Sequence, residues 1–379
     1  MRFITASFLI VIFSCAKYQV NANGDWCYEG NDCGPSHWAG DCKTGKSQSP
    51  IDLNSTLARN RADRKTLRLD DEYFKFYDNF FILNNGHSIQ IQLKDTARSD
   101  CLMDGAGLKG SYIFAQMHFH WGSNSNVGSE HTVDGKHYPM ELHLVHYSDK
   151  YDTLVSALQD SNRRAVAVLG IFFEITERDN PAIQSIVNEI PKVREPEHTL
   201  VAKPAQGRLN LTALLPRNLE LWRYEGSLTT PSCAEKVVWS VFRHPIGISE
   251  KQLNEFRSAK DSHGKPLVNN FRPTLALARR VVKYINVDQL LRKTDDPSNE
   301  IEDDPDASES TTIDQHDTDS HGHGIDHEND ETHTHSGEDN SIDSNKDSGA
   351  QRISTPLLSI LLCIFLCCSA SQISKILQH

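Results

Sequence analysis

The stretch that decides the fold reads QMHFHWG at residues 116–122, and its companion reads ELHLVH at residues 141–146. The first is a His-x-His pair inside an apolar alternating run, and the second brings another histidine close behind it. Between them they can supply three imidazoles to one metal ion. The rest of the chain is interpreted as segments that line the site, cover it or attach it to a membrane.

Side-chain alternation separates polar from apolar residues in both stretches, because residues two apart in a β-strand point to the same face. In the first stretch it predicts one face with Phe114, Gln116, His118 and His120, and an apolar face with Ile113, Ala115, Met117, Phe119 and Trp121. In the second it predicts a shared face for Glu141, His143, Val145 and Tyr147. If the two strands are neighbours, His143 completes a triangle with His118 and His120.

This triangle has the composition of a catalytic metal site. Three neutral imidazoles with one open position are typical of catalytic zinc, whereas four protein ligands close a structural site. The second ring nitrogen of a metal-bound histidine is usually held by an acceptor. Gln116 and Glu141 each precede a proposed ligand by two residues on the same face, so both suit that role. Other nearby histidines are interpreted as hydrogen-bonded structural residues: His131, His137 and His146.

Acidic charge is concentrated in one segment of the chain, which has 379 residues and a net charge of -12. Residues 294–350 contain 19 Asp and Glu against one Lys, a net of -18, which leaves 38 basic and 32 acidic residues, a net of +6, elsewhere. The acidity therefore says little about the partners of the folded part. We find no dinucleotide- or phosphate-binding loop and expect no nucleic-acid partner.

The N-terminus has the features of a secretory signal. A basic start and a short apolar run precede the small-residue site at Val20 to Ala22, so residues 1–22 are predicted to be a signal peptide. Secretion places the chain in an oxidising compartment. The folded part holds five cysteines, an odd number, and spacing alone does not say how they pair: Cys27, Cys33, Cys42, Cys101 and Cys233. Asn54 and Asn210 begin Asn-x-Thr glycosylation sequences.

Strands dominate the pattern from residue 80 onward. Runs rich in β-branched and aromatic residues predict strands at 80–83, 88–93, 112–121, 141–147, 165–175 and 237–242. Helical periodicity is weaker, at 151–159, 181–190 and 250–258, the last after a capping box of Ser249 and Gln252. We predict one β-dominated α+β domain, which is long enough to bury a sizeable core.

After residue 292 the chain is acidic and nearly free of aromatic residues, so residues 293–350 are predicted to be a disordered spacer. Its histidines are interpreted as part of a solvated spacer, and the alternative is weak binding of divalent metals by His316, His321, His323, His327, His333 and His335. Residues 351–379 carry an apolar run that is short for a membrane span. With small residues at Ser348 to Ala350, this tail fits a GPI-attachment signal. A short membrane helix is the alternative, because the tail ends in polar residues.

The chain resembles an alpha-class carbonic anhydrase, of the secreted or membrane-anchored kind, over residues 24–283. The motifs that carry the resemblance follow one another in order: Gly34-Pro35 with Trp38, Gln48 to Ile51, Asn84 to His87, residues 116–122, 128–134 and 141–146, Gly226 to Pro231, and Asn270 to Pro273. Two departures are mild, since Tyr147 and Phe271 replace frequent tryptophans with other aromatic residues. The resemblance implies a catalytic domain at residues 24–292 with a large, mostly antiparallel, twisted β-sheet and short flanking helices.

The resemblance also assigns roles residue by residue. The ligands of one catalytic Zn2+ match His118, His120 and His143, and their outer partners match Gln116, Glu141 and the backbone of Asn270. Thr229 matches the residue that accepts a hydrogen bond from zinc-bound hydroxide, and Glu130 matches the carboxylate that orients it. The proton shuttle matches His87, with Tyr28 and Asn85 in its water network. The pocket for CO2 matches Val145, Val168, Leu228, Thr230 and Trp239.

The implied function is reversible hydration of CO2 to bicarbonate and a proton, by attack of zinc-bound hydroxide, with sulfonamide-type inhibitors expected. The resemblance further implies the disulfides Cys42–Cys233 and Cys27–Cys33, and the remaining Cys101 is interpreted as a buried thiol in preference to an intermolecular link. We expect an extracellular enzyme, anchored at the plasma membrane or secreted. The alternatives are a carbonic-anhydrase-like binding ectodomain, or a metal-buffering or mineral-matrix protein acting through the acidic tail.

Overall fold

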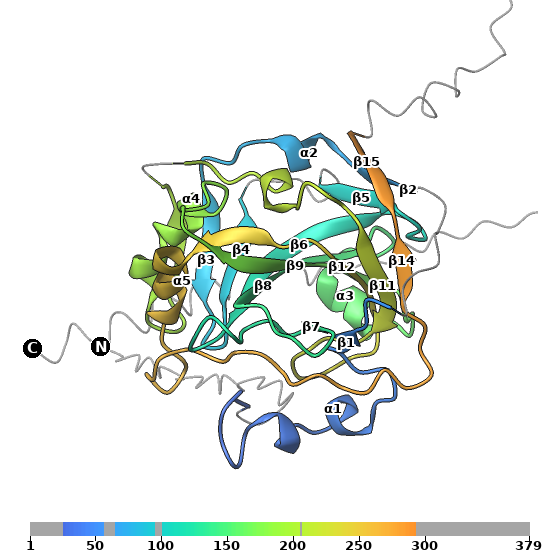
Figure 1. Cartoon of the computed structure of the whole chain (residues 1–379), viewed down its shortest axis with the longest axis horizontal. Coiled ribbons are helices and arrows are strands. Elements are labelled where there is room, and N and C mark those ends of the chain that lie inside the picture. Colours follow the sequence, from blue (N-terminus) through green and yellow to red (C-terminus); the bar gives the residue numbers. More distant parts are fainter. Residues whose placement is uncertain (1–25, 57–64, 95–100, 205–206, 293–379) are drawn as a thin grey trace, which may run out of the picture. The chain divides into compact units, whose positions relative to one another are not determined.

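Figure 1 shows the computed structural model of the chain, which describes residues 26–56, 65–94, 101–204 and 207–292. All of these lie in the first of two compact units, Met1–Ala307. The predictions for the signal peptide, the acidic spacer, the C-terminal tail and its anchor site at Ser348 lie outside the described residues. No helix within the described residues is long and apolar enough to cross a membrane.

A large twisted β-sheet forms the centre of the domain (Figure 1). Its main path runs in the order β10 (Thr199–Ala202), β3 (Phe80–Asn84), β4 (Ile89–Leu93), β6 (Tyr112–Trp121), β8 (Met140–Ser148), β9 (Val166–Thr176), β12 (Val237–Phe242), β11 (Leu221–Gly226) and β14 (Lys283–Ile285). Along this path only the pair β9–β12 is parallel. The predicted mostly antiparallel sheet is therefore confirmed.

Shorter strands extend this sheet beside its main path. β13 (Ile246–Ser249) pairs with β9, and a branch from β6 runs through β5 (Leu102–Gly105) and β2 (Lys65–Leu69) to β15 (Val287–Arg292). A separate parallel pair joins β1 (Asp52–Leu53) to β7 (Thr132–Val133). The sequence pattern did not predict these strands, five of which have only two to five residues and therefore show little alternation.

The helices are short and lie outside the sheet. They are η1 (Pro35–His37), α1 (Asp41–Thr44), α2 (Asp71–Phe74), α3 (Leu154–Gln159), α4 (Gln184–Val187), η2 (Ile190–Val193), η3 (Thr212–Leu214) and α5 (Glu250–Arg257). The capping box of Ser249 and Gln252 at the start of α5 is confirmed. The helix predicted at 181–190 is instead α4 followed by η2. Pro191 has no N–H to continue an α-helix across that point.

One feature of β6 corrects the predicted alternation. The pairing of β6 with β8 shifts between Phe114 and Gln116, which is a β-bulge at Ala115. Phe114 consequently packs in the same hydrophobic core as Met117 and Phe119, while Ile113 packs on the opposite face. The prediction for Phe114, Ile113 and Ala115 was wrong, because an extra residue in a strand reverses the alternation on one side of it. The predicted alternation is correct from Gln116 to Trp121.

Two hydrophobic cores cover opposite faces of the central strands. The larger contains Met117, Phe119 and Trp121 of β6 with Leu142 and Leu144 of β8. The smaller lies on the histidine face and contains Val145, Val168 and Trp239. The central strands are thus buried on both sides, which fixes their register because a slip by one residue would move every apolar side chain to the other face.

One disulfide closes a loop within the N-terminal segment, and a second joins this segment to the rest of the domain. Disulfides join Cys27 to Cys33 and Cys42 to Cys233, the two pairs that the resemblance implied. Cys101 is 2% exposed and lies in the larger core, which agrees with a buried thiol.

The two predicted glycosylation sites differ in accessibility. The Asn54 side chain is partly exposed, and its oxygen accepts hydrogen bonds from the backbone and hydroxyl of Thr56. Asn210 is only 6% exposed, and its amide nitrogen donates to the carbonyls of Phe74 and Lys75. A glycan on that nitrogen would replace one of its two hydrogens and displace one of these bonds, so Asn210 is less accessible to glycosylation than Asn54, and both sites stay predictions.

Candidate metal centre

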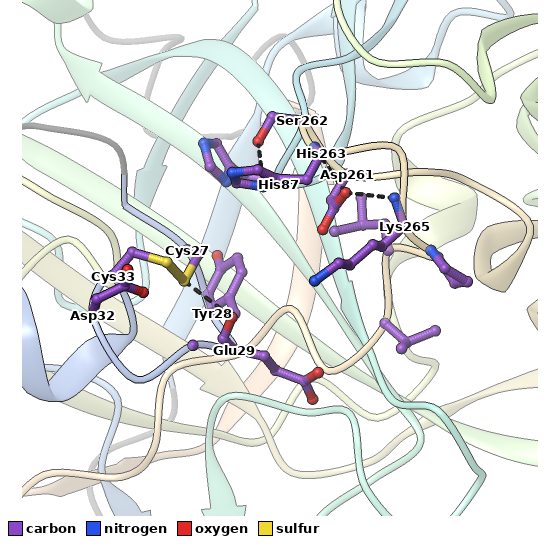
Figure 2. Close-up of a pocket in the computed structure, with 15 residues that line it drawn as sticks. Cys27, Tyr28, Glu29, Asp32, Cys33, His87, Asp261, Ser262, His263 and Lys265 are labelled. Atoms are coloured by element: carbon purple, nitrogen blue, oxygen red, sulfur yellow. Dashed lines mark hydrogen bonds between the residues drawn. A yellow bond between two sulfur atoms is a disulfide. The ribbon is translucent and has the colours of Figure 1, made fainter.

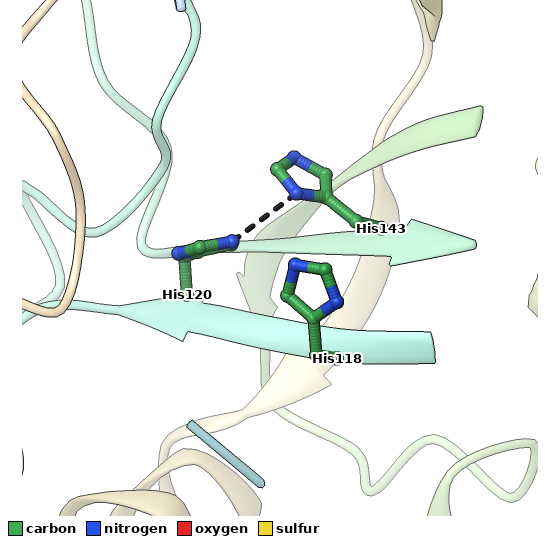
Figure 3. Close-up of side chains that lie close together, drawn as sticks. All are labelled: His118, His120 and His143. Atoms are coloured by element: carbon green, nitrogen blue, oxygen red, sulfur yellow. Dashed lines mark hydrogen bonds between the residues drawn. The ribbon is translucent and has the colours of Figure 1, made fainter. Parts of the chain in front are cut away.

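Three histidine rings converge from two adjacent strands. β6 carries His118 and His120 on one face, and the antiparallel register places His143 of β8 directly opposite His118. Figure 3 shows the three rings pointing toward one another. Their centroids are 4.6 to 5.2 Å apart, and one nitrogen from each ring lies within 4.8 Å of the others. The structure therefore brings together the three histidines that the alternation selected.

Each ring is held by an acceptor at the nitrogen that faces away from the centre. The three contacts are His118 Nδ1 to Gln116 Oε1 at 3.0 Å, His120 Nδ1 to the Asn270 carbonyl at 2.7 Å, and His143 Nε2 to Glu141 Oε1 at 2.8 Å. A nitrogen that meets an acceptor carries the proton. The other nitrogen of each ring is then a lone pair directed at the centre, which is the tautomer that a metal requires.

The arrangement fits a cation at the centre. His120 Nε2 and His143 Nδ1, both lone pairs in this tautomer, lie 3.1 Å apart. Glu130 Oε2 lies 3.5 Å from the first and 3.9 Å from the second, and this buried oxygen has no hydrogen-bond partner among the described residues. Lone pairs and a carboxylate oxygen repel one another unless a positive charge or a donor lies among them. Three neutral imidazoles with room for a further ligand form a donor set suited to Zn2+.

The protonation of these rings also favours metal binding. Desolvation, followed by the neighbouring imidazoles of His120 and His143, holds the pKa of His118 well below its usual range. Desolvation likewise lowers the pKa of His120, although Glu130 opposes that shift. Both rings are therefore neutral at pH 7, and only a neutral imidazole offers a lone pair to a metal.

Glu141 connects the three-histidine triangle to a fourth histidine, His131. Its Oε1 accepts from His143 and also from His131 Nδ1 at 2.7 Å, and its Oε2 accepts from the His131 backbone N–H at 2.8 Å. Burial alone would raise the pKa of the Glu141 carboxyl, but His131 and His143 beside it shift this pKa far below the usual range. A fully ionised carboxylate therefore orients His143. His131, Glu141 and His143 also lie close enough to hold a metal, but their hydrogen bonds to one another occupy the atoms that would bind it.

The sequence pattern did not predict the hydrogen bonds that hold the partners of the three histidines in place. His131 is completely buried, and its Nε2 lies 2.6 Å from the Tyr224 hydroxyl, which in turn donates to Ser49. The carbonyl of Asn270 is held in place by the side chain of the same residue, which accepts from Trp121 N–H and donates to the Phe119 carbonyl. No spacing rule reveals such partners, because Ser49, Tyr224 and Asn270 lie far from β6 and β8 in the sequence.

Glu130 reaches the triangle from a buried loop. Its Oε1 accepts from the Arg272 backbone N–H at 2.9 Å, and the Arg272 guanidinium donates to Gln48 Oε1 and to the carbonyls of Ser49 and Cys42. Thr229 is buried in the segment that follows β11. Among the described residues no hydrogen bond joins Thr229 to Glu130. The structure therefore places the carboxylate at the histidines but does not show the predicted bond to Thr229.

An apolar wall stands beside the histidines. Val145, Val168 and Trp239 are register partners across β8, β9 and β12, so their side chains form one row on the histidine face. The Trp239 ring lies 4.7 Å from His143, and Leu228 packs against the same cluster. Thr230, the last residue predicted for this pocket, is partly exposed, and its carbonyl accepts from the Cys233 N–H.

His87 lies in a separate, half-open cavity of about 460 Å3 near the N-terminal segment. Figure 2 shows it with Tyr28 and the Cys27–Cys33 disulfide on one side and with Asp261, His263 and Lys265 on the other. Its ring stacks on Trp26 at 3.7 Å and 15°. Desolvation lowers the pKa of His87 below its usual value, although Asp261 opposes the shift. The imidazole is therefore mostly neutral at pH 7.

The residues predicted to surround His87 have distinct surroundings. Asn85 is exposed, and its side-chain oxygen accepts from the backbone N–H groups of His87 and Ser88, so it holds the turn that presents His87. Burial, followed by the charge of Glu130, raises the pKa of the Tyr28 hydroxyl well above its usual range. Tyr28 therefore stays protonated and can donate a hydrogen bond in this cavity.

Comparisons with known proteins agree with this geometry. The family model described as eukaryotic-type carbonic anhydrase matches residues 33–286. The chain is 40% identical over 265 residues to carbonic anhydrase 7 of Homo sapiens, which covers 68% of this chain and 96% of that protein. It is 33% identical over 293 residues to carbonic anhydrase 15 of Mus musculus, with 72% and 86% covered. It is 35% identical over 267 residues to putative carbonic anhydrase 3 of Caenorhabditis elegans, with 69% and 98% covered. The chain belongs to the eukaryotic-type carbonic anhydrase family.

Proposed function

We propose that residues 24–292 form a zinc-dependent carbonic anhydrase, a lyase that catalyses the reversible hydration of CO2 to bicarbonate and a proton. The observation that carries this proposal is the convergence of three lone-pair nitrogens, from His118, His120 and His143, beside an apolar wall. Membership of the carbonic anhydrase family supports the same reaction. One Zn2+ is the expected cofactor, because the site offers three neutral imidazoles and a buried carboxylate nearby.

The chemistry divides between the metal and the chain. Zinc, when bound, lowers the pKa of a coordinated water to about 7, a value established for carbonic anhydrase itself, and so makes hydroxide available at neutral pH. The row of Val145, Val168 and Trp239 suits CO2, which is uncharged and gains nothing from polar contacts. Thr229 is proposed to orient the attacking oxygen through its hydroxyl. Glu130 Oε2, to which no described residue donates a hydrogen bond, is available to accept the proton of that hydroxyl.

His87 is proposed to move the released proton to solvent. The reaction produces one proton per CO2, and that proton has to leave a site whose histidines His120 and His143 are buried. A mostly neutral imidazole in a cavity open to water can accept a proton and pass it to buffer. The stacking of His87 on Trp26 would hold the ring at the mouth of that cavity.

We further propose that the enzyme works outside the cell. Two disulfides support this location, because such bonds persist in oxidising compartments. The proposed signal peptide at residues 1–22, glycan at Asn54 and GPI attachment at Ser348 belong to the same hypothesis. Release of the protein from cells by a phosphatidylinositol-specific phospholipase tests the anchor, and a protein that stays on the membrane after this treatment would favour a short membrane helix.

The function is tested with the purified full chain. CO2 hydration should depend on zinc and should be blocked by an aromatic sulfonamide. Deletion of residues 294–350 should leave turnover unchanged, because the proposed spacer contributes no site residue. A deletion that abolished activity would favour a role of the tail in metal supply. A folded, zinc-loaded protein without hydration activity would favour a binding ectodomain instead.

A further inference from the structure

A basic cavity lies apart from the histidine triangle. It is lined by the turn between β5 and β6 and by strands β11, β12 and β14, and its volume is about 560 Å3, which is in the usual range of small-molecule sites. None of the three zinc-site histidines lines it. Its apolar lining includes Leu108, Val238 and Ile285, whereas its charged lining consists of Lys109, Arg164, Arg223, Glu225, Arg280 and Lys283.

The charges of this lining do not balance. Glu225, the single carboxylate among the described lining residues, forms an ion pair with Arg164. The Arg280 guanidinium donates to the backbone carbonyls of Leu277, Ala276 and Glu225, which are neutral, and it lies over the Tyr224 ring. In the described part of the chain, neither Lys109 nor Lys283 forms an ion pair. The cavity therefore keeps an excess of positive charge.

Arg223 is the most unusual member of this lining. It lies on β11, where it pairs with Lys283 of β14 and Ser240 of β12. It is only 8% exposed, and its buried Nε has no hydrogen-bond partner in the part of the chain that the structure describes. No carboxylate among the described residues forms an ion pair with it. Desolvation lowers the pKa of Arg223 to about 10, so the side chain still carries its charge at neutral pH. Arginine is almost never buried in this way unless it is paired.

We propose that this cavity binds a small organic oxyanion of the carboxylate or phosphate type, with its charged end on Arg223 and its remainder against the apolar lining. The planar guanidinium fork matches the oxygens of carboxylates and phosphates, and a bound oxyanion supplies the acceptor that Arg223 lacks. Because Arg223 is recessed below the surface, a free molecule reaches it more readily than a phosphate fixed in a bilayer. This proposal is independent of CO2 hydration.

Calorimetric titration of the full chain with benzoate and with phenyl phosphate tests the site. The key variant is Arg223→Met, which keeps the length of the side chain and removes its charge. The matched control is Arg178→Met, which removes an exposed arginine elsewhere on the domain. We expect Arg223→Met to weaken the binding of at least one probe by about tenfold or more, and the control to bind like the wild type. Anions that bind at the zinc site would do so equally in all three proteins.

Thermal unfolding gives a second readout. Removing an unpaired buried charge should leave the melting temperature of ligand-free Arg223→Met equal to or above that of the wild type. The probe should raise the melting temperature of the wild type and not that of the variant. If Arg223→Met does not fold, the exposed Lys283→Met should still weaken probe binding several-fold.

Three results would overturn the proposal. The first is equal probe binding by the wild type and a folded Arg223→Met, and the second is an absence of binding by the wild type at millimolar probe. The third is binding to phosphatidic acid vesicles with no binding of either soluble probe.

Discussion

Replacement of Glu141 by glutamine tests how the metal ligands are oriented. The carboxylate is fully buried and accepts three hydrogen bonds, two at Oε1 from the rings of His143 and His131 and one at Oε2 from the His131 backbone. Glutamine keeps the size of the side chain but has only one accepting atom. Whichever way the amide is placed, its NH2 group faces at least one N–H donor.

The magnitude follows from which donor loses its acceptor. If the NH2 group faces the rings, His143 has to carry its proton on Nδ1, the atom directed at the metal. If the NH2 group faces the backbone, the ring contacts survive, but the negative charge that strengthens His143 as a ligand is lost. Loss of such an outer partner typically weakens metal affinity 10- to 100-fold, or by about 1.4 to 2.8 kcal/mol. We expect Glu141→Gln to fall in this range.

The assay is competition for zinc between the protein and a chromophoric chelator. The matched control is Gln116→Ala, which removes a single hydrogen bond from the partly exposed His118 and should cost less affinity. Circular dichroism and thermal melts with saturating zinc verify that each variant is folded. Unchanged zinc affinity in a folded Glu141→Gln protein would refute the reasoning.

Three further predictions concern proton transfer, the disulfide and acid stability. His87→Ala should reduce turnover on the order of 100-fold in dilute buffer and be restored by added imidazole, which replaces the missing proton acceptor; an equal loss in both buffers would argue against the shuttle. Cys233→Ser should lower the free energy of unfolding by about 2 to 5 kcal/mol in urea titrations, because its bond to Cys42 spans 191 residues; a stability equal to that of the wild type would contradict this. Burial lowers the pKa of His146 from 6.5 to about 4, so between these values the unfolded chain binds a proton that the folded protein does not. The wild type should therefore lose about 3 kcal/mol of stability as the pH falls through this window. The free energy of unfolding of His146→Gln should fall correspondingly less between pH 7 and pH 4. A fall identical to that of the wild type would contradict a lowered pKa of His146 in the folded protein.

The sequence predicted the centre of the fold well because β6 and β8 are long and strongly patterned. The bounds of β6 were predicted without error, and those of β8 to within one residue at each end. The bulge at Ala115 was not predicted, since apolar residues stand on both sides of it and hide the reversal. Short strands such as β14 depend on pairing partners that are distant in sequence, so local pattern does not reveal them.

In the candidate site too, the local sequence pattern predicted some residues, whereas others depend on contacts between distant parts of the chain. Side-chain alternation along the two strands alone selected His118, His120 and His143 as ligands. It also selected Gln116 and Glu141 as the residues that hold these ligands. The resemblance was needed for the Asn270 carbonyl, because it lies 150 residues from the His120 that it holds. The sharing of Glu141 between two histidines, and the unpaired charge of Arg223, required the structure because both depend on burial.

Stopped-flow measurement of CO2 hydration tests the central proposal most directly. The purified chain is compared with zinc, after removal of zinc by a chelator, and as His118→Ala with zinc present. We predict rapid hydration by the zinc-loaded wild type, loss of activity on chelation with recovery when zinc is returned, and little activity in His118→Ala. A folded, zinc-loaded wild type that does not hydrate CO2, or a His118→Ala variant as active as the wild type, would contradict it.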